Sequence, residues 1–218
     1  MRRFFSHSIP ITPWRAKNQW SLSLSRSFIL TLGLIIFGIG DGLLIVSHLG
    51  NAPWSVLSQG ISLRSGISIG WSTFLVSSAV LLLWIPFKQK PGLGTLANIA
   101  VIALAIDLTV AWIQTPQNVL LRLLIVIFGI ALVGAGSALY LTCGLGPGPR
   151  DGLMTAIHYA SNISVARVRA GIESTVLLVG WLLGGRVGIG TLLFACGIGA
   201  SVALWLALVG HLTRNTAQ

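Results

Sequence analysis

The sequence predicts an all-α membrane protein, a polytopic helix bundle built from two tandem homologous halves. Of its 218 residues, 54% are hydrophobic and 8% are charged, and the mean hydropathy is +0.88. A soluble domain carries about a quarter charged residues, because it must present a solvated surface. Apolar stretches near the ~20 residues needed to cross hydrocarbon recur along the chain. We therefore expect three membrane spans and one short half-helix in each half, with the halves related as an inverted repeat.

Six segments are predicted to cross the membrane. Their apolar residues surround each helix instead of forming one stripe, as lipid-exposed helices require. The second segment is short, and the fifth is the least apolar. The predicted spans are 27–49, 69–87, 94–112, 120–142, 167–183 and 189–209.

Two shorter segments, 53–65 and 149–162, are also predicted to be helical. Each begins with a proline, which suits the first turn of a helix. About 12 residues cover only ~18 Å, which is short for a crossing. We expect re-entrant half-helices or helices lying on the surface. If both crossed instead, the chain would have eight spans and its halves would be parallel, and length favours six.

The charge distribution predicts the orientation of the chain. The formal net charge is +10, from 14 Lys and Arg against 4 Asp and Glu. These cations gather at span ends and tails, where positive residues fix orientation, so nucleic-acid binding is not expected. Six crossings with a cytoplasmic N-terminus leave only Arg64, Arg122 and Arg186 outside. Both termini are then cytoplasmic, and the first 25 residues lack the continuous apolar region of a cleaved signal peptide.

An internal repeat divides the chain. Sliding the sequence by 96 positions, without a gap, aligns glycines, prolines and threonines that chance matches of leucine would not bring together. The expected parts are a basic N-terminal tail (1–25), two membrane repeats (26–117 and 118–210) and a C-terminal tail (211–218). An odd number of crossings in each half inverts the second half, as in many secondary transporters. The aligned pairs include Gly33 with Gly129, Gly40 with Gly136, Pro53 with Pro149, Gly92 with Gly188 and Thr95 with Thr191.

Each half contains the motif Leu-Gly-x-x-Pro at the start of its short helix. Unpaired N–H groups at such a helix start carry a positive partial charge and can bind an anion. Arg150 could add a bidentate grip on a carboxylate. The alternative is a structured turn in which Arg150 pairs with Asp151, with Trp54 as an interfacial anchor. The residues predicted to bind a solute here are Gly50, Pro53, Trp54, Gly146, Pro149, Arg150 and Asp151.

The four acidic residues all lie in or beside predicted helices. A charged side chain at the bilayer centre costs about 2.5–3.5 kcal/mol, so intramembrane carboxylates are functional candidates. Asp41, which has no nearby cation in the sequence, is the most suggestive and could carry a coupling proton. Glu173 is a second candidate, although Arg169 can pair with it four residues earlier on the same helix face. Asp107 lies toward the outer end of its span, where it can reach water.

The remaining reactive side chains give no sign of a metal or cofactor. His48 and His158 are interpreted as interfacial polar residues, because no other ligand clusters with either. Cys143 and Cys196 lie in apolar surroundings and are interpreted as packing residues. No metal, cofactor or disulfide is expected.

The second motif copy, Leu-Gly-Pro-Gly-Pro-Arg-Asp-Gly-Leu-Met at 145–154, also carries a family resemblance. Together with the first copy, Arg169, Glu173 and the pair Gly184-Gly185, it resembles the YczE/YitT-type bacterial integral membrane proteins. The resemblance covers about residues 25–210. It implies a multi-pass protein of the bacterial plasma membrane and supplies no substrate.

Three classes of function follow from these patterns. The favoured one is a secondary transporter for a small solute, anionic or bearing a carboxylate, and coupled to protons. The alternative is a non-transporting accessory or regulatory protein that acts through a partner complex. An enzyme is not expected, because motifs such as HExxH and GxSxG are absent. The expected partners are the lipid bilayer and the solute, and the small size of the bundle leaves a homodimer open.

Overall fold

The computed structural model describes residues 9–215 and, among these, the side chains up to Thr213. Arg2, Arg3, the side chain of Arg214 and the last residues of the predicted C-terminal tail lie outside the described residues. A single turn of 3-10 helix, Ile85–Phe87, follows the third helix, and no strand occurs within the described range, so the all-helical class is confirmed. The helices are α1 (Leu24–Ser47), α2 (Pro53–Ser65), α3 (Ile69–Leu82), α4 (Leu93–Trp112), α5 (Val119–Cys143), α6 (Pro149–Ser161), α7 (Val165–Leu182) and α8 (Ile189–Asn215).

Local sequence explains where several of these helices begin. Ser23 and Ser68 cap α1 and α3, each accepting a hydrogen bond from a backbone N–H of the first turn, and Asn118 does the same for α5. Such caps satisfy donors that a helix cannot satisfy itself. Helices α2 and α6 instead start at Pro53 and Pro149, whose fixed φ suits the first turn.

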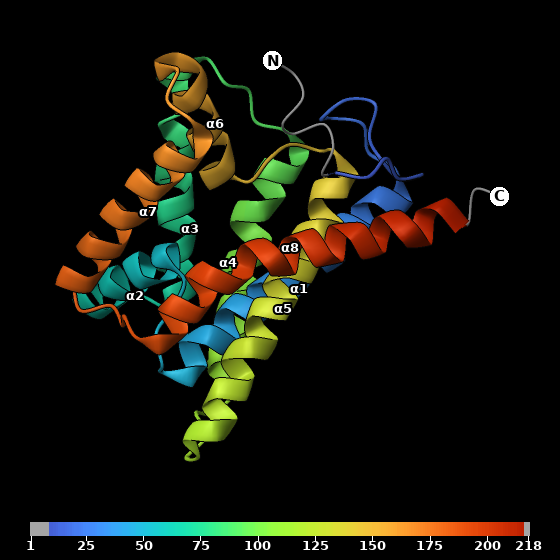
Figure 1. Ribbon diagram of the computed structural model, residues 1–218. Helices are drawn as coiled ribbons and strands as arrows, with labels where there is room; N and C mark the ends of the chain where they lie inside the picture. Colours follow the sequence, from blue (N-terminus) through green and yellow to red (C-terminus); the bar gives the residue numbers. More distant parts are fainter. Residues whose placement is uncertain (1–8, 216–218) are drawn as a thin grey trace.

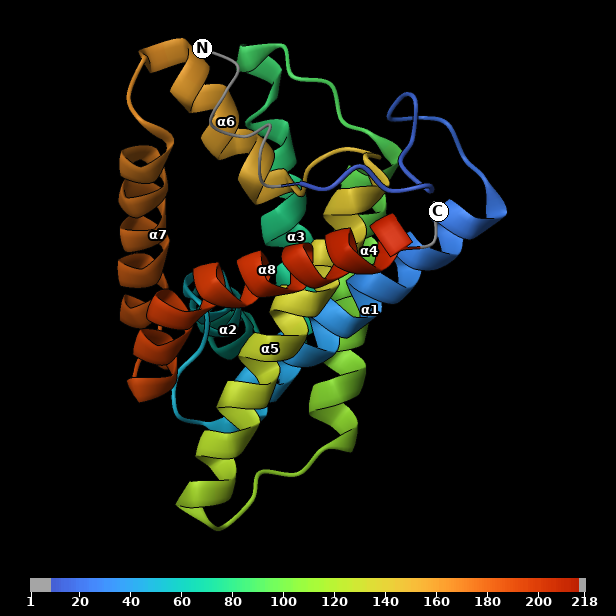
Figure 2. The same ribbon diagram turned by 45° about the vertical axis from the view of Figure 1, so that its right-hand side comes forward.

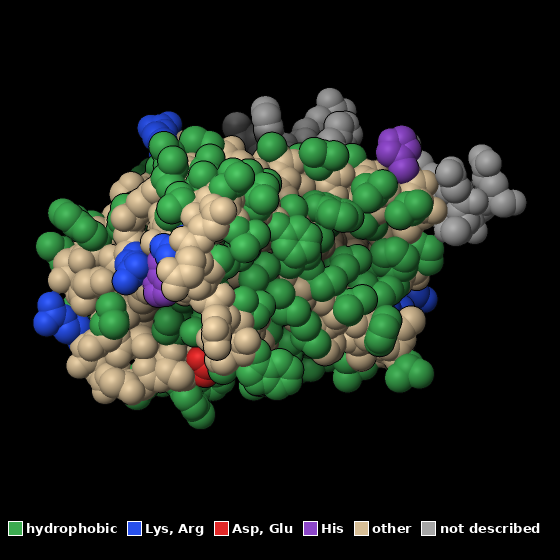
Figure 3. Space-filling view, turned by 90° about the horizontal axis from the view of Figure 1, so that it is seen from below, with side chains coloured by type: hydrophobic (Ala, Val, Ile, Leu, Met, Phe, Trp, Pro, Cys, Tyr) green, Lys and Arg blue, Asp and Glu red, His purple; other side chains and the backbone are tan. Residues whose placement is uncertain are grey.

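The structure supports a multi-pass membrane protein. Within the described range, five helical segments are long and apolar enough to cross a bilayer: α1, α4, α5, Ile69–Phe87 and Ile189–Thr213. Helix α7 has 18 residues but includes Arg167, Arg169 and Glu173, and its crossing stays a prediction. Many large apolar side chains are exposed, and hydrophobic side chains cover much of the face shown in Figure 3. Lipid contact accounts for such a surface, which soluble monomers rarely show.

The helices form two bundles. Helices α1, α4, α5 and α8 pack together and form what we call the central bundle. Helices α2, α3, α6 and α7 share a separate hydrophobic cluster that contains Trp54, Trp84 and Met154, and we call them the side bundle. Figures 1 and 2 show the side bundle to the left of the central bundle. The bundles are joined by the packing of α3 along α4.

Glycines bring α1 and α5 into backbone contact at the centre of the molecule. Gly33 lies against the backbone of Gly136, and Gly40 lies against the backbone of Gly129. A Cβ on Gly40 would come within 2.6 Å of the Gly129 carbonyl oxygen. Small residues permit this close approach, and the van der Waals contact that results drives helix association in lipid.

Backbone hydrogen bonds join the turn that follows the first long helix of each half to the turn that precedes the last helix of the other half. The Gly94 N–H donates to the Leu145 carbonyl (2.8 Å), and the Gly190 N–H donates to the Leu49 carbonyl (2.9 Å). Gly50 and Gly146 adopt φ of +114° and +112°, a conformation that glycine tolerates and L side chains rarely adopt. A Cβ on either residue would also collide with the glycine turn of the other half. The Leu-Gly-x-x-Pro motifs are therefore built into the contact between the halves.

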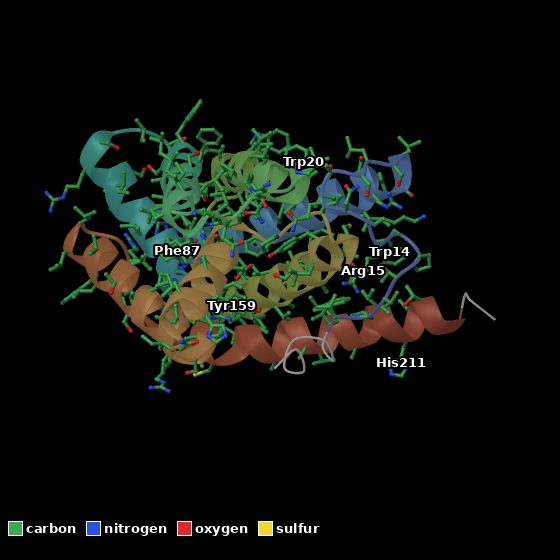
Figure 4. The ribbon with its side chains drawn as sticks, turned by 90° about the horizontal axis from the view of Figure 1, so that it is seen from above. Trp14, Arg15, Trp20, Phe87, Tyr159 and His211 are labelled. Atoms are coloured by element: carbon green, nitrogen blue, oxygen red, sulfur yellow. The ribbon has the colours of Figure 1, made fainter. Side chains whose placement is uncertain are left out.

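Residues 9–23 fold over the end of α5. Thr12 and Trp14 donate side-chain hydrogen bonds to the Thr142 carbonyl and hydroxyl oxygens, and the Ala16 N–H donates to the Cys143 carbonyl. Figure 4 shows Trp14 and Arg15 in this segment, between α8 and the end of α5. Trp14 is thus held by α5 in addition to any contact it makes with lipid.

Gly40→Ala is expected to destabilise the protein, because the added methyl group would meet backbone atoms of α5 that cannot move independently. Overpacking of this kind costs about 1–3 kcal/mol. Thermal unfolding of the purified protein in detergent measures the change. Gly171→Ala is the matched control, since a Cβ at Gly171 meets nothing within 4 Å. Equal melting temperatures for the two variants would contradict the close crossing of α1 and α5.

Candidate functional site

A groove of about 1190 Å³ lies between the central and side bundles. The central bundle contributes residues of α5 and α8 to its walls, with Asn98 and Ile102 from α4. The side bundle contributes the first turns of α2 and α6 and part of α7. The groove therefore lies at the boundary between the two bundles, and a movement of one bundle against the other would change its shape.

Arg150 is the cation at the centre of this site. It lies in the first turn of α6 and lines the groove. Its guanidinium carbon lies 5.2 Å from the ring centroid of Trp54, a cation–π arrangement. Among the described residues it makes no hydrogen bond and no ion pair, although Asp41, Asp151 and Glu173 lie within electrostatic range. Arg150 thus offers all five of its N–H donors to a ligand.

The surroundings of Arg150 favour an anion. Trp54 is 6% exposed, and its indole N–H is buried without a hydrogen-bond partner among the described residues. The first turn of α6 presents backbone N–H groups that the helix cannot satisfy, and these attract negative charge. The Trp84 indole donates to the Pro149 carbonyl (2.9 Å) and fixes the start of this helix. A buried Trp54 is not the interfacial anchor that the sequence suggested.

Asp151 is held by α5 and forms no ion pair with Arg150. The Tyr140 hydroxyl donates to Asp151 Oδ2 at 2.9 Å, and Tyr140 is buried. This bond links the central bundle to the side bundle at the groove. The alternative of a simple Arg150–Asp151 pair is not what the structure shows, because the one ion pair found in the described part of the chain joins Arg169 to Glu173.

Asp41 is buried behind the groove, with an exposure of 2%. The Ser55 hydroxyl lies 2.8 Å from Oδ1 and 2.7 Å from Oδ2 of this carboxylate, and it donates to either oxygen. Within the described range Asp41 has no cation in direct contact, and Arg150 is the charge that attracts it. An intramembrane carboxylate held by a single hydroxyl group can exchange a proton without breaking a salt bridge.

The other two acids have structural partners. Asp107, on α4, accepts hydrogen bonds from the Ser68 hydroxyl and the Gly70 N–H (2.6 Å), and so caps the start of α3. Asp107 is half-buried in this capping position, and that it also reaches water stays a prediction. Glu173 accepts a hydrogen bond from Arg169 Nε at 2.8 Å, four residues earlier on α7, and both line the groove.

The predicted binding residues fall into three places. Gly50 and Gly146 lie in the turns that are hydrogen-bonded to the other half, where the backbone of that half covers them. Asp41 lies behind the groove wall. The residues that line the groove are Pro53, Trp54, Pro149, Arg150, Asp151 and Glu173.

Sequence reasoning missed Ser55 and Tyr140. Ser55 is 14 residues from its partner Asp41, and Tyr140 is 11 residues from Asp151. In each case the two partners belong to different helices, so no periodicity joins them. A weak signal was available for Ser55, because it lies two residues after the proline that begins the short helix.

Several buried polar atoms have no hydrogen-bond partner within the described part of the chain. They belong to the segment 51–73, which comprises α2 and the start of α3. Buried polar atoms in proteins are usually satisfied, often by ordered water. Ordered water can satisfy such atoms, and the same segment contains Ser55, the hydrogen-bond partner of Asp41. The atoms are Asn51 Oδ1, Trp54 Nε1, Ser58 Oγ, Ser72 Oγ and Thr73 Oγ1.

His48, His158 and the two cysteines do not line the groove, whereas His211 of α8 does. His48 follows the last residue of α1 and adopts a left-handed conformation there. His158 contacts the Ile163 carbonyl at the end of α6. Cys143 and Cys196 are free. Over the described range, no three His, Cys, Asp or Glu side chains are placed to hold a metal ion.

These features define a multi-pass helical membrane protein with a groove between two bundles, lined by Arg150, Asp151 and the Arg169–Glu173 pair. The chain belongs to the family of unknown function DUF6198, whose model matches residues 24–207.

Two relatives show the range of similarity. An uncharacterised protein of Haemophilus influenzae is 48% identical over 204 residues, 94% of each chain. The uncharacterised membrane protein YczE of Bacillus subtilis is 32% identical over 165 residues, which cover 75% of this chain and 77% of YczE. The resemblance to YczE-type proteins is thereby confirmed. No solved structure matches the chain.

Ser55→Ala is expected to destabilise the protein, because it removes the hydroxyl group that donates to the buried Asp41 carboxylate. Leaving a buried acceptor unsatisfied costs about 1–3 kcal/mol. Chemical or thermal unfolding in detergent measures the loss. Ser58→Ala, one turn further along α2, is the control: Ser58 is equally buried but has no partner among the described residues, so its removal should be neutral or stabilising. A loss of stability in Ser58→Ala as large as in Ser55→Ala would count against the Asp41 contact.

Proposed function

We propose that this protein is a secondary transporter for a small anion, with Arg150 as the residue that binds it. The observation that carries the proposal is a cation without a direct partner among the described residues, set in a groove between two bundles. Arg150 is half-buried, and a cation partly withdrawn from water is costly to maintain unless a ligand compensates it. Charge-assisted hydrogen bonds from a guanidinium to a carboxylate or similar anion are the strong, geometrically specific kind.

We propose in addition that the chain is a tandem inverted repeat, an architecture that favours a transporter. Helices α2, α3 and α4 begin at residues 53, 69 and 93, and α6, α7 and α8 begin 96 residues later, at 149, 165 and 189. The same shift exchanges the two turn contacts: Gly94 with Leu145 becomes Gly190 with Leu49. It also exchanges the Gly33–Gly136 contact with the Gly40–Gly129 contact. Such reciprocity is what a pseudo-two-fold axis produces, and inverted repeats are common in carriers with midplane sites.

The arrangement of the bundles supplies a means of alternating access. Each half contributes two helices to the central bundle and two to the side bundle. In carriers of this kind, one bundle rocks against the other around a fixed site. Three aspartate contacts cross this boundary and would be remade or strained by such a motion: Asp41 with Ser55, Asp151 with Tyr140, and Asp107 with Ser68.

The coupling that we propose runs through Arg150. Its charge attracts the Asp41 carboxylate. When an anion binds Arg150, that attraction is offset, and proton uptake by Asp41 becomes more favourable. By linkage, protonation of Asp41 in turn strengthens anion binding by the same factor. The result is uptake of an anion together with a proton.

For the membrane topology we propose six crossings, with both termini in the cytoplasm of a bacterial cell. Loops 83–92 and 144–148 lie at the same end of the molecule as the start of the described chain, and loop 113–118 lies at the opposite end (Figure 1). Helices α2 and α6, with 13 residues each, would enter the membrane and return. The relatives found in Haemophilus influenzae and Bacillus subtilis support a bacterial membrane.

Single cysteines test this topology. With Cys143 and Cys196 replaced by alanine, a cysteine in place of Gln117 should react with a membrane-impermeant maleimide in intact cells, and a cysteine in place of Gln89 should react only after lysis. Both native side chains are exposed, so either cysteine is chemically reachable. Eight crossings would reverse the result, since α2 would then carry the chain back across the membrane before α3 begins.

Arg150→Gln is expected to reduce anion uptake at least tenfold in proteoliposomes, because it removes charge-assisted hydrogen bonds worth about 1.5–3 kcal/mol. The probes are radiolabelled succinate, phosphate and methanesulfonate, driven by an inward proton gradient. Arg167→Gln is the control, because Arg167 is an exposed arginine that bonds Ser164 and does not line the groove. Asp41→Asn should keep anion binding, measured by calorimetry, and lose accumulation driven by the proton gradient.

The outcomes separate the two classes of function. Equal uptake by wild type and Arg150→Gln would overturn the binding role of Arg150. Proton-driven accumulation by Asp41→Asn at the wild-type rate would overturn the coupling role of Asp41. If wild type neither binds nor moves any of these anions, the alternative of a non-transporting accessory protein is favoured.

A further inference from the structure

We propose that the anion path has a second mouth, closed in this structure, at a small cavity between the end of α1, α2 and the end of α4. This mouth opens when α3 parts from α4, and α7 closes on α8 in the same movement. The inference rests on the proposed function and its inverted repeat, and it adds the exit and the residues that close each mouth. Residues 96 positions apart in the two halves are called counterparts below.

The centre of the groove is shared by both halves. Trp54 and Arg150 are counterparts, and they contact each other at 5.2 Å. Two equivalent residues touch in this way when they lie at the axis that relates the halves. Every residue of repeat 26–117 that lines the groove also has its counterpart in the lining, as Ser77 has Glu173. The binding position at Arg150 therefore lies where the halves meet, with one end of the molecule on either side.

From this centre the groove continues toward the end of the molecule that carries both termini. Its further lining includes Thr155, Val165 and His211, together with segment 9–11. The start of α7 and the end of α8 lie at this end (Figure 1). In the proposed topology, the groove is thus open toward the cytoplasm.

A small cavity of about 270 Å³ in the first half corresponds to this mouth. Thr115, which lines it, belongs to the loop at the opposite end of the molecule. The same positions of the repeat therefore form a wide opening in one half and a narrow cavity in the other, as in the open and closed forms of one mouth. Five of the ten residues that line the cavity have counterparts in the groove lining, among them Gln59 with Thr155, Ile69 with Val165, and Thr115 with His211.

The packing of α3 on α4 closes the second mouth. Gly70 lies against the Ala103 carbonyl and the Asp107 carboxylate, and Ser68 donates a hydrogen bond to the same carboxylate. In the second half, no comparable packing of the described residues joins α7 to α8. A Cβ on Gly199, the counterpart of Ala103, would meet nothing within 4 Å. There is therefore space for α7 to close on α8 as α3 closes on α4.

Asp151 changes its partner in this movement. In this structure it accepts a hydrogen bond from Tyr140 at 2.9 Å. Its counterpart Ser55 instead bonds Asp41, whose own counterpart is Ser137. When the halves exchange their arrangements, Asp151 moves one turn along α5, from Tyr140 to Ser137, which lines the groove.

The same exchange removes the partner of the Asp41 carboxylate. Ser55 moves to the level of Leu44, the counterpart of Tyr140, whose side chain has no hydrogen-bonding group. Asp41 then lacks its hydroxyl donor while the second mouth is open. Proton exchange at Asp41 is thereby joined to the opening of that mouth.

Two matched cysteine pairs in the cysteine-free protein test the assignment. Ser68→Cys with Asp107→Cys joins α3 to α4, and Ser164→Cys with Ala203→Cys is the counterpart pair on α7 and α8. Disulfides are formed with copper phenanthroline in nanodiscs and identified by mass spectrometry. We expect the first pair to crosslink fast and the second slowly but measurably, and in a protein with all four cysteines one crosslink should exclude the other. Ser164→Cys with Leu204→Cys is the control that should not crosslink, since Leu204 is 71% exposed and lies outside the groove.

Tyr140→Phe and Ser137→Ala should move this equilibrium in opposite directions. Tyr140→Phe removes the partner of Asp151 in this structure, so the α7–α8 pair should crosslink about fivefold faster. Ser137→Ala removes the partner in the second state, so the same crosslink should form about fivefold more slowly. Fivefold is the ratio that ~1 kcal/mol represents, a usual value for a polar contact in a membrane protein. Both rates are measured without any anion.

Each contrary result has a distinct meaning. If the α7–α8 pair never crosslinks while the α3–α4 pair does, the second mouth does not open and the inference is overturned. If both crosslinks form in one molecule, the mouths do not alternate, and the inference is again overturned. Equal rates in Tyr140→Phe and Ser137→Ala would contradict the change of partner at Asp151.

Uptake of the probe anions by crosslinked proteoliposomes separates this inference from the proposed function. We expect either crosslink to abolish uptake and a reducing agent to restore it. Uptake that neither crosslink changes would overturn the second mouth and leave the transporter standing. If the crosslinks alternate as expected but the reduced protein moves no anion, the two states are supported and the proposed function fails.

Discussion

The contact between α1 and α5 is the constraint on which the other helices depend. In lipid, helices gain little from the hydrophobic effect when they associate, so close packing must supply most of the attraction. The glycines at 33, 40, 129 and 136 provide it by letting two backbones touch. Helix α4 packs on α1 and α8 packs on α5, so the central bundle is assembled around this crossing. The side bundle and the groove take their positions from it.

Three of the four acids lie on the boundary between the bundles. Asp41, Asp107 and Asp151 each accept a hydrogen bond from a group of the opposite bundle. A polar contact within a membrane protein contributes about 1 kcal/mol, enough to favour one arrangement without locking it. Packed glycines therefore hold the central bundle together, and hydrogen bonds of moderate strength set how the bundles stand relative to each other.

Much of this architecture was predictable from the sequence, for physical reasons. Hydrocarbon thickness dictates helix length, so α1, α4 and α5 follow from hydropathy, and the prolines at 53 and 149 mark the starts of α2 and α6. The position of Arg150 beside a helix start was also predictable. The bonds from Ser55 to Asp41 and from Tyr140 to Asp151 were not, because they depend on how separate helices cross. The role of α8 as a wall of the groove was hidden for the same reason, since its apolar face looks like any lipid-facing surface.

Trp84, whose indole bonds Pro149, also acts as a spacer. It stands between α3 and α6, where its ring occupies the space that a side chain on Gly152 would need. On the other side of the side bundle, Gly180 lies directly against the backbone of α2 at Val56 and Leu57. Within the side bundle, α3 and α6 are therefore separated by an aromatic ring, whereas α2 and α7 are in backbone contact. A single aromatic ring thus separates the start of α6 from α3, so the place of Arg150 within the side bundle depends on the size of one side chain.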